Sequence, residues 1–136
     1  MAEEVLVKES ISSEMIAAGQ QLARYLNDSE LPTDALLWFY SPEDNAWRFV
    51  VATSEVRNRG PKSVYQQLRQ IVSTIPAEER KIPLDNIFVL DSHDPLIQLL
   101  GSAVATGDEI AGIRFTRNVI NGVLIEDAYI YKLRRI

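Results

Sequence analysis

The sequence predicts a mixed α/β fold of the α+β type, in which helices pack on a mixed five-stranded sheet. Three observations support this fold. An amphipathic stretch near the N-terminus has helical periodicity, an aromatic-rich segment has the pattern of a β-hairpin, and an Asn-Gly dipeptide separates two apolar runs near the C-terminus. Helical and strand patterns alternate between the two hairpins, so the expected order of elements is α-β-β-α-β-α-β-β.

The first helix is expected to start at Ser12 or Ser13 and to reach about Asn27. A serine at this position can accept a hydrogen bond from a free backbone N–H of the first turn. Turn-forming residues and Pro32 then stop the helix, and residues 1–10 are expected to form a short extended lead-in. The apolar stripe of the helix comprises Met15, Ala18, Leu22 and Leu26.

The next segment predicts an aromatic hairpin, with strands over residues 35–40 and 46–53 joined by turn-forming residues. The first of these strands is continuously apolar, which is typical of a strand buried on both faces. The register that places Ser41 opposite Ala46 gives two aromatic pairs, Tyr40 with Trp47 and Trp38 with Phe49.

The middle of the chain predicts a helix, a strand and another helix. A second helix is expected from Pro61 to Ile75, because proline fits the first helical position. A short apolar strand follows over residues 86–90, and a third helix opens at Pro95 and closes by Thr106. The helices that join the second strand to the third, and the third to the fourth, each favour parallel strands.

The last part of the chain predicts a second hairpin, because Asn121-Gly122 matches a type I′ turn. The fourth strand includes Ile113 to Ile120, and the fifth runs from Val123 through Tyr131. A two-residue turn fixes the register. It predicts the pairs Ile120–Val123, Arg117–Glu126, Phe115–Ala128 and Ile113–Ile130.

The composition is that of one soluble globular domain spanning residues 1–136. No apolar run reaches the ~18 residues of a membrane span, and the acidic N-terminus lacks the positive start of a signal peptide. The absence of cysteine excludes disulfides and thiolate metal sites. We therefore expect a cytoplasmic protein that does not bind membranes.

The charge pattern argues against nucleic acid as a partner, because the formal net charge is -5. Two short basic runs are expected to be solvated surface. They are Arg57, Arg59 and Lys62, and Lys132, Arg134 and Arg135.

Asp91, His93 and Asp94 are the candidate catalytic residues, because they lie between a buried strand and a helix. Open α/β sheets often bind ligands at this end of a strand. The simpler interpretation is that Asp94 or Ser92 caps the helix and that His93, the only histidine, is a polar loop residue.

The sequence lacks the motifs that would indicate a metal site, a phosphate-binding loop or a serine nucleophile. Asp85, Glu126 and Asp127 could join a metal site, but no Glu-x-Lys pattern follows Glu126-Asp127. Glycine-rich phosphate loops and the Gly-x-Ser-x-Gly elbow are also missing from the sequence, so no cofactor is expected.

The function that the sequence favours is a non-catalytic protein-interaction or self-associating module, expected to bind a protein partner or to form a homo-oligomer. Tyr129 and Tyr131 share one face of the final strand. If that strand lies at a sheet edge, these side chains are candidate interaction residues. The alternative is a metal-dependent hydrolase or nuclease that uses the Asp91, His93 and Asp94 segment.

Overall fold

The computed structural model describes residues 10–134, and its elements follow the predicted order. The expected lead-in over residues 1–10 lies, apart from Ser10, outside the described residues. A short helix and two 3₁₀ turns are additional to the expected elements. In chain order the structure has α1 (Ser13–Asp28), β1 (Ala35–Ser41), β2 (Ala46–Ala52), α2 (Glu55–Arg59), α3 (Pro61–Ser73), η1 (Ala77–Glu79), η2 (Leu84–Asn86), β3 (Ile87–Leu90), α4 (Pro95–Gly101), β4 (Ile113–Ile120) and β5 (Val123–Leu133).

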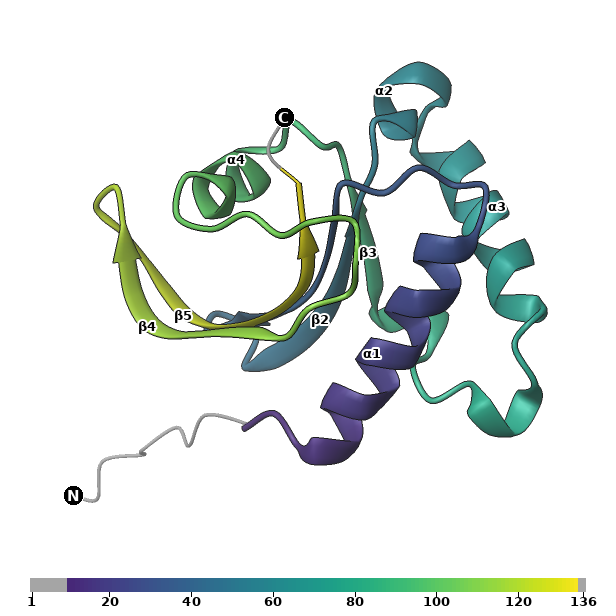
Figure 1. The fold of residues 1–136 in the computed structure, drawn as a ribbon, viewed down its shortest axis with the longest axis horizontal. Helices are drawn as coiled ribbons and strands as arrows, with labels where there is room; N and C mark the ends of the chain where they lie inside the picture. The colour runs from purple at the N-terminus through teal and green to yellow at the C-terminus, as the bar shows by residue number, and fades with distance from the viewer. Residues whose placement is uncertain (1–9, 135–136) are drawn as a thin grey trace.

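The five strands form one mixed sheet in the order β3-β2-β1-β5-β4 (Figure 1). β2 and β3 are parallel, as their helical crossover predicts, and the other neighbouring pairs are antiparallel. The expectation that the second crossover also gives parallel strands is wrong. β4 lies at the opposite edge of the sheet and runs against β3, because β5 pairs with β1 and β4 is its hairpin partner.

Two apolar cores lie on the two faces of the sheet. On one face, α1 and α3 cover side chains that include Trp38, Phe49 and Tyr131. The predicted aromatic pairing is confirmed: Trp38 is opposite Phe49 and Tyr40 is opposite Trp47, each with ring centroids 5.4 Å apart. On the other face, α4 lies within the curve of the sheet at β4 and β5 (Figure 1).

The final hairpin has the predicted register, since Ile120 pairs with Val123, Phe115 with Ala128 and Ile113 with Ile130. Both turn residues have positive φ, 49° for Asn121 and 80° for Gly122. The same register leaves Arg117 opposite Glu126.

The pairing is interrupted at Arg117, which has a φ of 51° between the paired residues Thr116 and Asn118. A left-handed residue turns its side chain away from the regular alternation of a strand. Within the described part of the chain, Arg117 and Glu126 do not form an ion pair, so the expected charge pairing is not made.

β5 is an internal strand, so the expected edge position of Tyr129 and Tyr131 is wrong. β5 pairs with β1 on one side and with β4 on the other. Tyr131 is buried and donates a hydrogen bond to the Ile16 carbonyl, whereas Tyr129 is half-buried. The chain order alone suggested an edge, but the long-range pairing with β1 places this strand inside the sheet.

The actual edges are β3 and β4. Beside β3, the hydroxyl of Tyr65 from α3 accepts a hydrogen bond from the Val89 N–H at 3.0 Å. Arg48 on neighbouring β2 stacks over the Phe88 ring, 4.3 Å from its centroid. The backbone and side chains of the β3 edge are therefore partly covered by the protein itself.

Replacing Trp38 with alanine should lower the free energy of unfolding by about 3–5 kcal/mol, because the indole is buried and its hydrogen bond is also lost. Urea denaturation measures this change. Val119→Ala on exposed β4 is the control, with an expected change within about 0.5 kcal/mol. A loss below about 1 kcal/mol for Trp38→Ala would contradict the central place of this ring in the core.

Candidate functional site

The predicted candidates Asp91 and His93 contact each other in the turn after β3. Asp91 Oδ1 accepts the His93 backbone N–H at 2.7 Å and lies 3.4 Å from His93 Nδ1. Arg57 Nη2 reaches the same oxygen at 3.3 Å. The His93 N–H is the main cause that holds the pKa of the Asp91 carboxyl below its ordinary value, and the Arg57 charge acts in the same direction.

The rest of this segment forms a helix cap. The Asp94 carboxylate accepts the Leu96 N–H at 2.9 Å at the start of α4. Ser92 is buried and donates to Asp34 Oδ2 at 2.6 Å, which ties the turn to the segment before β1. Asp94 is therefore the residue that caps α4, whereas Ser92 is not the cap and binds Asp34 instead.

The other candidate carboxylates lie elsewhere. Glu126 and Asp127 are on β5, and β2 and β1 separate that strand from β3. Asp127 is buried and bound by Arg114, with Nε to Oδ1 at 3.1 Å and Nη2 to Oδ2 at 2.8 Å. Among residues 10–134, no three histidine or carboxylate side chains group as metal ligands would.

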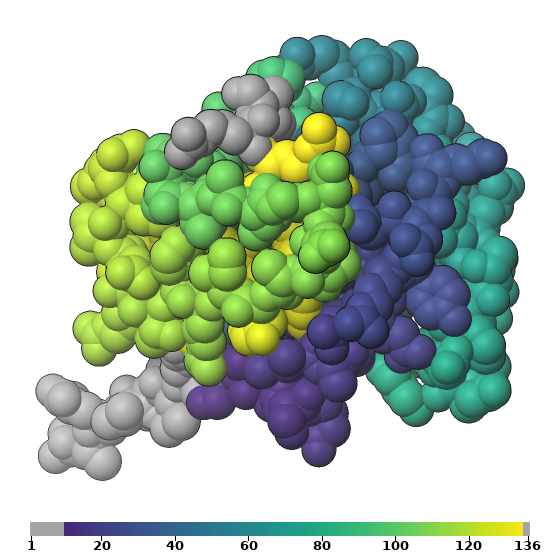
Figure 2. All heavy atoms as spheres, in the orientation of Figure 1, coloured from purple at the N-terminus to yellow at the C-terminus, as the bar shows by residue number. Residues whose placement is uncertain are grey.

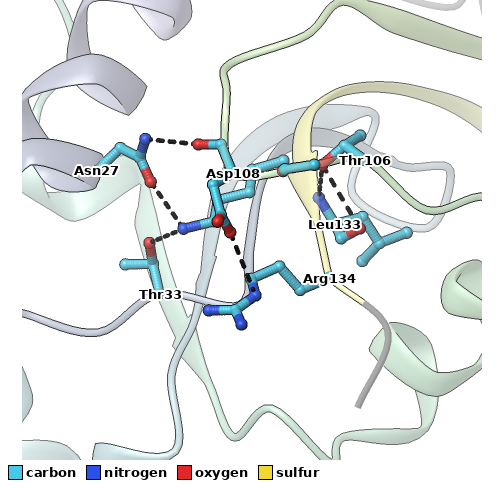
Figure 3. A network of polar contacts seen from close by, with 8 residues as sticks. Asn27, Thr33, Thr106, Asp108, Leu133 and Arg134 are labelled. Carbon is cyan, nitrogen blue, oxygen red and sulfur yellow. Dashed lines mark hydrogen bonds and ion pairs between the residues drawn. The ribbon is translucent and has the colours of Figure 1, made fainter.

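Lys132 is a buried cation that the sequence interpretation missed, because it was assigned to a solvated basic run. Its side chain is 5% exposed, and its amine donates to Asn27 Oδ1 at 2.7 Å and Thr33 Oγ1 at 3.3 Å (Figure 3). Burial lowers the pKa of Lys132, and the nearby Arg134 charge adds to that effect. Arg135 of the same run lies outside the described residues.

The contacts around Lys132 hold the segment before β4 against the end of α1 and the end of β5. Asn27 also donates to the Asp108 carbonyl at 2.9 Å, and Arg134 Nε lies 3.6 Å from Asp108 Oδ1. Thr106 forms backbone and side-chain hydrogen bonds with Leu133 (Figure 3). We therefore interpret Lys132 as part of a structural junction between the end of α1 and the end of β5.

A hollow of about 840 Å³ lies between α1, the aromatic hairpin and the loop before β3. In Figure 2 the purple start of α1 and the teal segment after α3 border each other in this region of the surface. We call this hollow the tryptophan groove. Its apolar lining includes Met15, Ala18, Trp38, Trp47, Ile82 and Pro83.

Two hydrogen bonds hold α1 in the position that shapes the groove. The Trp38 indole donates to the Met15 carbonyl at 2.9 Å, and the Tyr131 hydroxyl donates to the Ile16 carbonyl at 2.6 Å. Gly19 allows this close approach, since a Cβ at that position would collide with both aromatic side chains. The N-cap of α1 is Ser12, which accepts the Met15 N–H at 3.1 Å.

The two ends of the groove differ in charge. Glu14 lies at the start of α1, and Lys81 lies on the loop wall. Lys81 also borders an adjoining hollow of about 350 Å³, together with Arg69 and Arg80. We call these three cations the basic recess. As far as the described residues go, Arg69 and Lys81 have no carboxylate within ion-pair distance.

The residues that line the groove include Glu14 and Lys81 but no histidine. Met15 and Ala18 belong to the predicted apolar stripe of the first helix, and both are half-buried and pack against the core. The clustering of aromatic residues in the first hairpin was the signal that could have located this site.

Comparison with protein families, with curated proteins and with solved structures finds no match for this chain. None of the described helices is long and apolar enough to cross a membrane.

Adding Mg²⁺ or Mn²⁺ should leave the melting temperature unchanged, because the Asp91 and Asp94 carboxylates already accept hydrogen bonds from the protein. The measurement is a thermal melt of the parent and of His93→Ala, which should fold normally. A metal-dependent rise in melting temperature that His93→Ala abolishes would contradict this and favour the hydrolase hypothesis.

The burial of Lys132 should make stability rise with pH in alkaline solution. Its pKa is lower in the folded than in the unfolded chain, so between those two values the unfolded chain binds more protons. Folding therefore becomes more favourable as the pH rises toward the ordinary lysine value of 10.5.

The measurement compares urea unfolding of the parent and of Lys132→Met between about pH 8 and about pH 10. The parent should gain stability relative to Lys132→Met across this range, and Lys62→Met on the exposed side of α3 is the matched control. A parallel pH dependence of parent and Lys132→Met would contradict the prediction.

Proposed function

We propose that this protein is a non-catalytic protein-interaction module whose tryptophan groove binds a short peptide segment with apolar residues beside acidic ones. The observation that carries this proposal is the groove itself, with its buried indoles and its adjoining basic recess. Its volume of about 840 Å³ lies within the ~300–1,000 Å³ that is typical of ligand sites.

The apolar lining supports binding of aliphatic side chains. Trp38 and Trp47 line the groove with only 2% and 4% of their surface exposed, and half-buried Met15 lines it beside them. Burial of one Val, Leu or Ile side chain contributes roughly 1.5–3 kcal/mol, so two or three such residues could offset the cost of ordering a short peptide. Aromatic side chains often contribute most of the binding energy at protein interfaces.

The charges at the groove ends support a direction of binding. The basic recess favours carboxylates on the ligand, whereas Glu14 at the other end favours a cation or a neutral group. Such charges contribute more to selectivity and orientation than to affinity. A peptide with acidic residues at one end of an apolar run fits this order.

The alternative, a metal-dependent hydrolase at Asp91, His93 and Asp94, has less support. These side chains are engaged in a turn and a helix cap, and they do not line the tryptophan groove.

The groove should bind a synthetic peptide in which two glutamates precede valine, leucine and valine. Trp38 and Trp47 are the only tryptophans in the chain, so their fluorescence reports binding directly. The expected result is a saturable change in emission, with Lys81→Glu binding about five- to tenfold more weakly because it reverses a groove charge.

Lys62→Glu is the matched control, because Lys62 is exposed on α3 and does not line the groove. A peptide with lysines in place of the glutamates should bind less tightly than the acidic peptide. Equal binding of the two peptides would contradict the charge selection, and no response to either would contradict the proposed site.

A further inference from the structure

We propose that Asn121, in the turn of the final hairpin, is a site of spontaneous deamidation, at which the backbone nitrogen of Gly122 attacks the side-chain amide. The reaction converts a neutral turn residue into a negatively charged one without an enzyme. It requires neither the tryptophan groove nor a partner.

The turn that contains Asn121 is open to solvent. Asn121 and Gly122 are both exposed, and they are the two residues between β4 and β5, with φ of 49° and 80°. Among the described residues beyond its two chain neighbours, no heavy atom lies within 4 Å of the place that a Cβ of Gly122 would take. Water and hydroxide can therefore reach the Gly122 nitrogen.

The Gly122 N–H is free to lose its proton. The pairing of the hairpin begins at Ile120 and Val123, and a two-residue turn leaves the N–H of its second residue outside the ladder. Within residues 10–134, the Gly122 N–H donates no hydrogen bond. Removal of this proton by hydroxide therefore breaks no hydrogen bond of the fold.

The side-chain amide of Asn121 is held only weakly. Its Nδ2 donates to Ser102 Oγ at 3.4 Å, which is longer than the ~2.7–3.2 Å usual for such bonds. Asn27 is the opposite case, because its amide donates to the Asp108 carbonyl at 2.9 Å and accepts from Lys132 at 2.7 Å. The Asn121 amide can therefore turn toward the Gly122 nitrogen at the cost of one weak contact.

The residue after an asparagine decides how closely the next backbone nitrogen can approach the amide. A side chain on that residue crowds the attack, and glycine has none. Asn121 is the only asparagine in the chain that is followed by glycine. The residues that follow the other asparagines are Asp28, Ala46, Arg59, Ile87 and Val119.

The reaction is balanced with water as its only co-reactant. The Gly122 nitrogen gives its proton to hydroxide and bonds to Asn121 Cγ, the Cγ–Nδ2 bond breaks, and ammonia leaves with a proton from water. Water then opens the resulting cyclic imide. Cleavage at Cγ gives an ordinary aspartate, whereas cleavage at the backbone carbonyl gives an isoaspartyl residue, through whose side chain the backbone then runs. No atom is oxidised or reduced.

The products change the tip of the hairpin in two ways. A carboxylate appears among the exposed apolar residues Val119, Val123 and Leu124. In the isoaspartyl form the backbone also gains one carbon atom, although the two-residue turn requires a fixed spacing to place Ile120 opposite Val123. Because Ile120 is buried in the core that α4 covers, the isoaspartyl hairpin should pack less well against that helix.

Ageing of the full-length protein in mildly alkaline buffer tests the proposal, with one sample folded and one unfolded in guanidinium chloride. Trypsin cleavage after Arg117 and Lys132 then gives one peptide, residues 118–132, that contains both Asn118 and Asn121. Asn118 is the matched internal control, because it is also exposed on this hairpin but precedes Val119.

Mass spectrometry of this peptide should show that Asn121 of the folded protein loses its amide at least about tenfold faster than Asn118. The folded rate at Asn121 should lie within about tenfold of its unfolded rate. Equal rates at the two asparagines would overturn the proposal. A folded rate further below the unfolded rate would also overturn it, because the turn would then protect the residue.

Urea unfolding of three species separates the added charge from the added backbone atom. They are the fresh parent, Asn121→Asp, and the isoaspartyl product isolated by chromatography. Asp-Gly also suits a type I′ turn, so Asn121→Asp should keep the urea midpoint of the parent, whereas the isoaspartyl product should unfold at a lower urea concentration. Equal midpoints of Asn121→Asp and the isoaspartyl product would overturn the conclusion that the added atom disturbs the hairpin.

Discussion

The contact between α1 and the centre of the sheet determines the shape of the surface on which the proposed function depends. Trp38 on β1 and Tyr131 on β5 each donate a hydrogen bond to a carbonyl of α1, at Met15 and Ile16. Burial raises the pKa of Tyr131, so its hydroxyl remains a donor. Gly19 removes the Cβ that would hold the helix away from these side chains. Movement of α1 would therefore change the core and the tryptophan groove together.

The parts of the fold that were predicted correctly are those determined by short-range patterns. Turn chemistry at Asn121-Gly122 and strand alternation fix the register of one hairpin, and the aromatic pairing of Trp38 with Phe49 follows in the same way. The place of β5 depends on its pairing with β1, about 90 residues away along the chain. Local periodicity contains no information about that partner, which is why Tyr131 was expected at an edge.

The candidate site was less predictable, because the groove is formed by elements that are far apart in the sequence. Met15 and Ala18 follow the helical period of the apolar stripe, yet both are half-exposed where they line the groove with Ile82. Lys132 was missed for a different reason. The strand was expected to end at Tyr131, but it continues to Leu133 and carries the lysine into the interior.

The two edge strands of the sheet, β3 and β4, each carry a feature that disfavours pairing with another chain. An open strand can template the addition of further chains, which is the first step toward amyloid-like stacking. On β3, the Tyr65 hydroxyl accepts a hydrogen bond from the Val89 N–H. On β4, the left-handed backbone of Arg117 interrupts the regular pairing of the strand with β5. A chain that added at either edge would lose hydrogen bonds at these positions. Both features disfavour the addition of another chain at the sheet edges, and the proposed binding surface lies away from those edges, between a helix and a hairpin.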